Sequence, residues 1–259
     1  NPKAKLRLCK LLISTGDLDT SITICLEAIP QSSKLEFIDI LAGALELRNE
    51  PEVSVEIWKG LLSKTWGAGG GNEKAKHIFV ILESSAAVAI RTWKDLVIEQ
   101  PNQSSFLRSL SSVIEASTDS IVAVSTWKDL CLAHPDKSDF FNRLLRALGA
   151  ISNFTLTINT LKDLTMAHFE KALFYDNLRN ALEASDEKDI EASVWRDLAI
   201  SHPSHTSFRK ELKRAEAKQA GIDVEAACSI CWDQDMDTVF YCGHTCCFSC
   251  ATQITKCPE

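Results

Sequence analysis

A period of 34 residues runs through most of the chain and limits its fold more than any other feature of the sequence. The string Trp-Lys-Asp-Leu begins at Trp93 and again at Trp127, and related strings begin one and two periods later, at Leu161 and Trp195. The same step relates phenylalanines and leucines outside these strings: Phe106, Phe140, Phe174 and Phe208, and Leu110, Leu144, Leu178 and Leu212. Chance does not align so many positions, so the chain consists of repeated structural units.

Each unit has the pattern of two helices. Apolar residues recur at helical spacing, as in Phe140, Leu144 and Leu148, and Pro135 ends the helix before them. Weaker copies of the pattern continue upstream, where Trp58 keeps the internal spacing. A single pair of helices cannot bury both of its faces, so neighbouring pairs must stack. The sequence therefore predicts an all-α fold, a helical-repeat solenoid of about six helix pairs over residues 1–217.

This helix-turn-helix period resembles the tetratricopeptide repeat family over roughly residues 1–217. Gly16, Ala28 and the prolines that end the helices match the family's pattern, whereas tryptophan stands where that family often has a smaller aromatic residue. Most first helices also lack the family's Trp and Gly. The resemblance implies a right-handed solenoid whose concave face captures a segment of another protein.

The repeated aromatic residues are expected to form the core between helices. His134, His168 and His202 also recur at the repeat period, each at the end of the second helix of its unit. There an imidazole can bind backbone carbonyl groups that lack a helical partner, so we expect a structural role and not a metal site. The repeats show no Ser/His/Asp or paired-carboxylate pattern typical of a catalytic site.

The net charge of the chain argues against some classes of binding partner. The chain has 28 Lys and Arg against 35 Asp and Glu, a net charge of −7, which argues against a surface dedicated to nucleic acid or to an anionic membrane. No apolar run approaches the roughly 18 residues of a membrane span, and no signal-peptide pattern opens the chain. We therefore expect a cytoplasmic protein, with the nucleus as the alternative compartment.

Seven of the ten cysteines lie in the last 32 residues. The residues there that can bind a metal come mostly in pairs: Cys228 and Cys231, Cys242 and His244, Cys247 and Cys250, and then Cys257. Paired thiols two residues apart, without a secretory signal, indicate metal ligands in a reducing compartment and not a disulfide framework. Zn²⁺ takes four sulfur or nitrogen ligands, and this spacing lets one tight turn present two of them.

The order and spacing of these ligands resemble the RING finger family over residues 228–259, after a linker predicted at 218–227. The segment from Asp237 to Phe240 and the string Cys242-Gly243-His244 look like RING fingers of the inhibitor-of-apoptosis kind. The resemblance implies a small zinc-binding domain with two Zn²⁺ sites whose ligands interleave along the chain.

The resemblance also assigns the ligands. The first ion would be held by Cys228, Cys231, Cys247 and Cys250, and the second by Cys242, His244 and Cys257. The family places its eighth ligand three residues after Cys257, one position beyond Glu259, so we expect the printed chain to end inside its domain, with a degenerate finger as the alternative. Cys246 is surplus to this set, either a thiol packed beside the site or a substitute ligand.

RING domains generally act as ubiquitin ligases without a covalent intermediate, because they hold a ubiquitin-charged conjugating enzyme in a reactive pose. No catalytic residue is therefore expected in this chain. By position, Ile230, Ile254 and Pro258 correspond to the family's apolar groove for the conjugating enzyme. The family's arginine that clamps ubiquitin follows the eighth ligand.

The sequence as a whole predicts a RING-type ubiquitin ligase whose helical repeats recruit a protein substrate. The expected partners are a ubiquitin-conjugating enzyme, ubiquitin and the substrate, with a second copy of the chain as a further candidate. One alternative is a non-enzymatic scaffold or adaptor with a structural or dimerising RING. Another is a subunit of a larger assembly in which a different chain selects the target.

Overall fold

The computed structural model describes residues 1–32, 34–65, 73–82, 85–185, 188–221, 228, 238–239, 245–246 and 248–253. They belong to two compact units, Asn1–Ile151 and Ser152–Glu259. Within the described residues up to position 221, all regular structure is helical, which confirms the prediction of an all-helical repeat.

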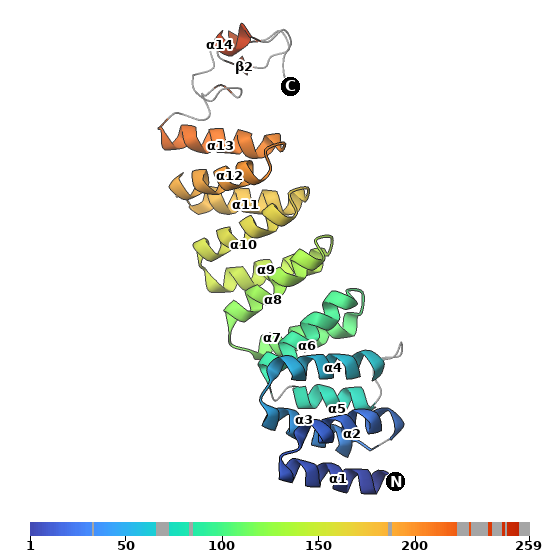
Figure 1. Ribbon diagram of the computed structural model, residues 1–259. Coiled ribbons are helices and arrows are strands. Elements are labelled where there is room, and N and C mark those ends of the chain that lie inside the picture. The colour runs from blue at the N-terminus through green and yellow to red at the C-terminus, as the bar shows by residue number, and fades with distance from the viewer. Residues whose placement is uncertain are drawn as a thin grey trace. The chain divides into compact units, whose positions relative to one another are not determined.

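Unit 1 contains nine described helices and unit 2 contains five, with one pair of two-residue strands. The helices of unit 1 are α1 (Pro2–Thr15), α2 (Leu18–Gln31), α3 (Glu36–Arg48), α4 (Pro51–Thr65), α5 (Glu73–Leu82), α6 (Ala86–Glu99), α7 (Ser104–Ala116), α8 (Ser120–Ala133) and α9 (Ser138–Ile151). Unit 2 has α10 (Phe154–Ala167), α11 (Ala172–Ser185), α12 (Lys188–Ser201), α13 (Thr206–Gln219), β1 (Thr238–Val239), β2 (Thr245–Cys246) and α14 (Phe248–Ala251). Figure 1 shows the longer helices of each unit following one another as hairpins.

Local sequence explains where several of these helices begin and end. Asp17, Asp119 and Asn153 are N-caps, and their side-chain oxygens accept hydrogen bonds from backbone N–H groups in the first turns of α2, α8 and α10. Gly16 ends α1 with a φ of 82°, in the left-handed region that glycine adopts without a steric cost.

The closest helix packing joins the second helix of one repeat to the first helix of the next, as in α6 with α7, α8 with α9, and α12 with α13. A short turn, closed by a backbone hydrogen bond, connects the two helices of each such pair. The N–H of Gln103 donates to the carbonyl of Gln100 at 3.0 Å, and the N–H of Lys137 donates to the carbonyl of His134 at 3.1 Å. The repeated turn therefore sets the repeated packing.

The repeated tryptophans and phenylalanines meet inside these helix pairs. The ring centroids of Trp93 and Phe106 lie 6.0 Å apart, and those of Trp195 and Phe208 lie 6.3 Å apart. All four side chains are buried, as are Phe140 and the leucines that end the repeated strings. Large aromatic side chains contribute most of the buried apolar area in a core of this kind. The prediction that they form the core is confirmed.

The polar residues of the Trp-Lys-Asp-Leu string connect successive repeats. The Nζ atom of Lys94 lies 2.7 Å from Oδ2 of Asp129, and Lys162 forms the same ion pair with Asp197. In both cases the lysine of one string pairs with the aspartate 35 residues later, in the next string. The tryptophan or leucine at each end of the string therefore packs in the core, while the lysine and aspartate between them join neighbouring repeats.

The repeated histidines also connect repeats. The Nε2 atom of His134 lies 2.8 Å from the carbonyl oxygen of Ile98, and Nε2 of His202 lies 2.9 Å from that of Met166. Both carbonyls belong to the last turn of a second helix in the preceding repeat, where no amide of their own helix can reach them. These histidines have the structural role that the sequence predicted.

Replacing Trp93 with alanine is expected to destabilise unit 1 by about 3–5 kcal/mol, the usual cost of removing a buried aromatic side chain. In a repeat array the loss acts mainly on adjacent repeats, so hydrogen exchange should speed up around α5 to α8 first. Leu47→Ala is the matched control, because Leu47 is 63% exposed on α3. Equal melting temperatures for the two variants would contradict the assignment of Trp93 to the core.

A double-mutant cycle on Lys94 and Asp129 should give a coupling free energy of about 0.5–1 kcal/mol, which salt reduces, because both side chains are partly exposed. Arg91 and Glu52 form the control pair. Their N–O distance of 2.8 Å is similar, but their side chains are 53% and 78% exposed, so coupling close to zero is expected. Chemical denaturation measures both cycles, and equal couplings would show that the repeated pair has no special role.

Candidate functional site

The structure describes two of the seven predicted zinc ligands. Cys228 is fully buried, and Cys250 is half-buried in α14. The other predicted ligands and the three predicted groove residues lie outside the described residues: Cys231, Cys242, His244, Cys247 and Cys257, and Ile230, Ile254 and Pro258. Upstream, α13 continues to Gln219, two residues into the segment predicted as the linker.

The described residues of the tail include one antiparallel strand pair. Thr238 pairs with Cys246, and Val239 pairs with Thr245. Cys246, the surplus thiol of the sequence pattern, is fully buried, as is Cys228. A segment of this size is too short to fold on an apolar core alone and usually needs metals or disulfides. Two buried thiols in such a segment therefore favour one of these two kinds of cross-link.

The donor set suits Zn²⁺, because thiolates and a neutral imidazole are the ligands that zinc prefers in structural sites. Zinc binds the thiolate form of cysteine and stabilises it by its own charge. Within the described residues, no group of three or more Cys, His, Asp or Glu side chains could hold a metal ion. Those residues include only Cys228 and Cys250 from the predicted set, so the two zinc sites remain a prediction.

The cysteines of the repeats have a different chemistry. Burial raises the pKa of the Cys131 thiol to about 12, and burial together with the adjacent Cys9 raises the pKa of Cys25 to about 12. Both thiols are therefore protonated at neutral pH. Because the thiolate is the reactive form, Cys25 and Cys131 are core residues and not nucleophiles.

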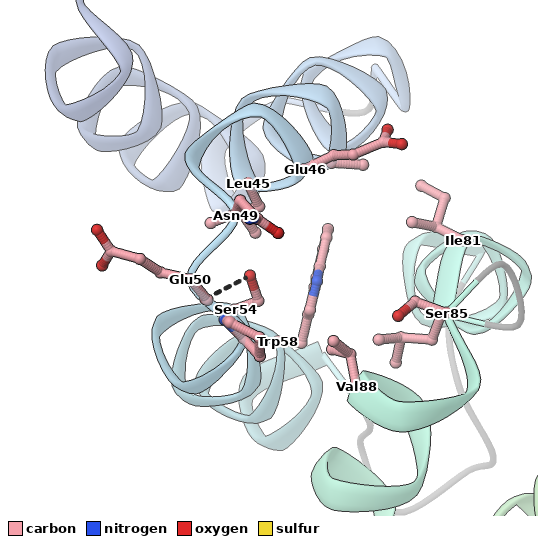
Figure 2. A pocket seen from close by; sticks show the side chains of 12 residues that line it. Leu45, Glu46, Asn49, Glu50, Ser54, Trp58, Ile81, Ser85 and Val88 are labelled. Atoms are coloured by element: carbon pink, nitrogen blue, oxygen red, sulfur yellow. Dashed lines mark hydrogen bonds between the residues drawn. The ribbon is translucent and has the colours of Figure 1, made fainter.

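The repeats of unit 1 contain a pocket of about 340 Å³ beside Trp58, which we call the Trp58 pocket. It is lined by the end of α3, the start of α4, the end of α5 and the start of α6. Figure 2 shows the Trp58 ring between Leu45 and Asn49 on one side and Ile81 and Val88 on the other.

A second pocket of about 270 Å³, the Trp127 pocket, lies among α7, α8 and α9. It occupies the same place in the repeat, because its residues follow those of the Trp58 pocket by 69 positions, which is two periods of 34 plus one extra residue. The corresponding residues are Leu45 and Ile114, Glu46 and Glu115, Glu50 and Asp119, Ser54 and Ala123, Trp58 and Trp127, and Ile81 and Ala150. The pockets are thus a feature of the repeat itself.

The two pockets differ in their remaining walls. The Trp58 pocket has Leu82 and Val88 there, whereas the Trp127 pocket has Arg143 and Arg146. The described linings of both pockets combine apolar, polar and charged side chains, as sites that bind a ligand do.

The sequence identified Trp127 as a core residue but did not identify the pockets. One signal in the sequence could have indicated the pockets. Acidic residues recur at the same positions relative to the core tryptophan, Glu46 and Glu50 before Trp58, and Glu115 and Asp119 before Trp127, and packing alone does not need them.

None of the described helices combines the length and the apolar character that crossing a membrane requires. No protein-family model matches the chain, and no curated protein sequence matches it.

The zinc prediction is tested by metal analysis of the purified protein. We expect bound zinc in the wild type and a loss of zinc in Cys228→Ser, because this variant removes a predicted ligand. Cys246→Ser is the matched control: its thiol is equally buried and lies in the same segment, but it is not in the ligand pattern. Zinc-free wild type, or equal zinc in both variants, would contradict the assignment.

Removing the metal should act on the tail alone. Structural zinc contributes about 10–16 kcal/mol to the folding of small finger peptides, so a chelator should unfold residues 228–259. The helices α1 to α13 contain no predicted zinc ligand and should keep their far-ultraviolet circular dichroism. A large loss of helical signal on chelation would show that the metal supports the repeats instead.

Proposed function

We propose that the protein is a RING-type ubiquitin ligase whose helical repeats recruit a protein substrate. The observation that carries this proposal is the ligand pattern of the tail, with Cys-x2-Cys, Cys-x-His, Cys-x2-Cys and Cys-Pro in the order and spacing of a RING finger. The helical repeat supports it, since stacked helix pairs present extended surfaces that bind other proteins. In the same proposal the repeats form a right-handed, tetratricopeptide-like solenoid, and the protein works in a reducing compartment such as the cytoplasm.

The zinc ions would supply only a fixed backbone in this proposal. Cys228, Cys231, Cys247 and Cys250 would hold one ion, and Cys242, His244 and Cys257 would hold the other together with one further ligand. Ligand positions fixed in this way let the side chains between them present a constant surface to a partner.

The chain's own residues would then act by orientation. Ile230, Ile254 and Pro258 would contact a ubiquitin-charged conjugating enzyme, and the substrate on the repeats would supply the attacking lysine. Holding the reactants in place makes the transfer effectively unimolecular, so no nucleophile from this chain is required. Residues 218–259 carry two lysines and six acidic residues, a net charge of −4, which suits a partner with a basic surface.

The alternative is a scaffold or adaptor whose RING is structural or mediates dimerisation. The repeats alone favour neither function, because described pockets that suit binding would serve a ligase and an adaptor equally well. Ile230 separates the two. An apolar side chain between two zinc ligands is useful to a docking partner but has little use in a purely structural finger.

The test uses the full-length protein with ubiquitin, activating enzyme and a panel of conjugating enzymes. The wild type should discharge at least one charged conjugating enzyme. Ile230→Ala should weaken binding of that enzyme by about 2 kcal/mol, roughly thirtyfold, because a central apolar anchor is lost without a change in the zinc ligands.

Ile200→Ala is the matched control for this substitution. Ile200 is also a β-branched apolar residue and is 71% exposed, but it lies on α12 within the repeats. Its removal should leave discharge unchanged. A wild type that discharges no enzyme in the panel would favour the scaffold, whereas full activity of Ile230→Ala would overturn the placement of the groove.

A further inference from the structure

Two arginines on α9 form part of the wall of the Trp127 pocket. The guanidinium carbon of Arg143 lies 5.3 Å from the centroid of the Trp127 ring, and the side chain is half-buried. Arg146, one turn further along α9, lines the same pocket. Neither arginine makes an ion pair or a hydrogen bond with any residue in the part of the chain that the structure describes.

The residues at the equivalent positions of α5, 69 positions earlier, are Lys74 and His77, which lie outside the lining of the Trp58 pocket. The Nζ atom of Lys74 donates to the carbonyl of Ile29 at 2.6 Å, and Nε2 of His77 lies 2.6 Å from Oδ1 of Asp39. The polar groups at these two positions therefore have partners on α5, whereas on α9 they line a pocket and have none among the described residues.

Arg143 is half-buried as a residue, and its guanidinium lies over the Trp127 ring, a contact that compensates only part of the hydration a cation loses on burial. A cation that is held in place and not neutralised is a binding site for an anion.

We propose that the Trp127 pocket binds an aspartate or glutamate side chain in an extended segment of a protein partner. This inference rests on the proposed function only in identifying the partner as the substrate of the ligase. The two arginines would hold the carboxylate, and the methyl groups of Ala123, Ala147 and Ala150 would contact a small apolar residue next to it.

The other side of the pocket selects a carboxylate over a phosphate. Glu115 and Asp119 also line the pocket, so a group with two negative charges is repelled more strongly there than a group with one. The Asp119 carboxylate is already engaged, since it accepts hydrogen bonds from the N–H groups of Ile121 and Val122 at the start of α8. The single charge and planar shape of a carboxylate fit a guanidinium fork.

A random peptide library displayed on phage tests this proposal with the wild-type protein as bait. Enriched peptides should contain Asp or Glu beside a small apolar residue. The best peptide is then labelled and titrated by fluorescence anisotropy, together with versions that carry Gln or phosphoserine in place of the acidic residue. Both replacements should weaken binding by about tenfold or more. Gln removes the charge-assisted hydrogen bonds to the arginines, and phosphoserine adds a second negative charge that Glu115 and Asp119 repel.

Variants of the protein locate the site. Arg146→Gln and Arg143→Gln should each weaken binding of the selected peptide by about tenfold to a hundredfold. Arg146 is exposed, so its replacement changes charge without changing the packing. Arg108→Gln is the matched control, since Arg108 is an exposed arginine of α7 outside the pocket, and it should bind the peptide like the wild type.

Three results would overturn the inference: no enrichment of acidic peptides, equal binding by Arg146→Gln, or tighter binding of the phosphoserine peptide than of the carboxylate. None of these measurements involves ubiquitin. If acidic peptides bind through Arg143 and Arg146 but the protein has no ligase activity, this site is supported and the proposed function is wrong. Ligase activity without peptide selection would do the reverse.

Discussion

The packing of a tryptophan from one repeat against a phenylalanine from the next is the interaction on which the rest of the structure depends. In Trp93 with Phe106 and in Trp195 with Phe208, both rings are buried between the second helix of one repeat and the first helix of the following one. The two rings of each contact belong to different repeats, so a single repeat by itself cannot form this contact. The free energy of unfolding therefore depends on the contacts between neighbouring repeats, and each further repeat within a unit adds to it.

Stacking helices in this way leaves polar groups at every junction, and the same repeated residues satisfy them. His134 and His202 reach back to carbonyls at the end of the preceding helix, and Lys94 and Lys162 reach forward to the aspartate of the next string. An unpaired buried carbonyl would cost more than the net gain from an average hydrogen bond. Because these contacts do not involve the pocket residues, a side chain such as Arg143 can change without breaking them.

The repeats could be predicted from the sequence because the residues that recur every 34 positions are also the residues that are buried between helices. A ring that must fill the same gap in every unit returns at the same position, so Trp93, Phe106 and His134 could be assigned before their contacts were known. The pockets could not, because they arise where side chains from three or four helices leave space, and Arg143 has no counterpart of like chemistry at the next period. For the tail, Cys228 and Cys250 alone are described among the predicted ligands, so that part of the site stays a prediction from spacing.

In the proposed ligase, substrate recognition and ubiquitin transfer would have different physical requirements. A repeat array keeps the effect of a substitution close to its position, so the wall of one pocket can change while distant repeats keep their stability. The tail is too short to depend on an apolar core, and the proposed metal ions would make its fold independent of the helices. Catalysis by orientation requires only that the tail be folded and the substrate be held. If the proposed site in the Trp127 pocket selects the substrate, Arg143 and Arg146 could change without affecting the residues proposed to contact the conjugating enzyme.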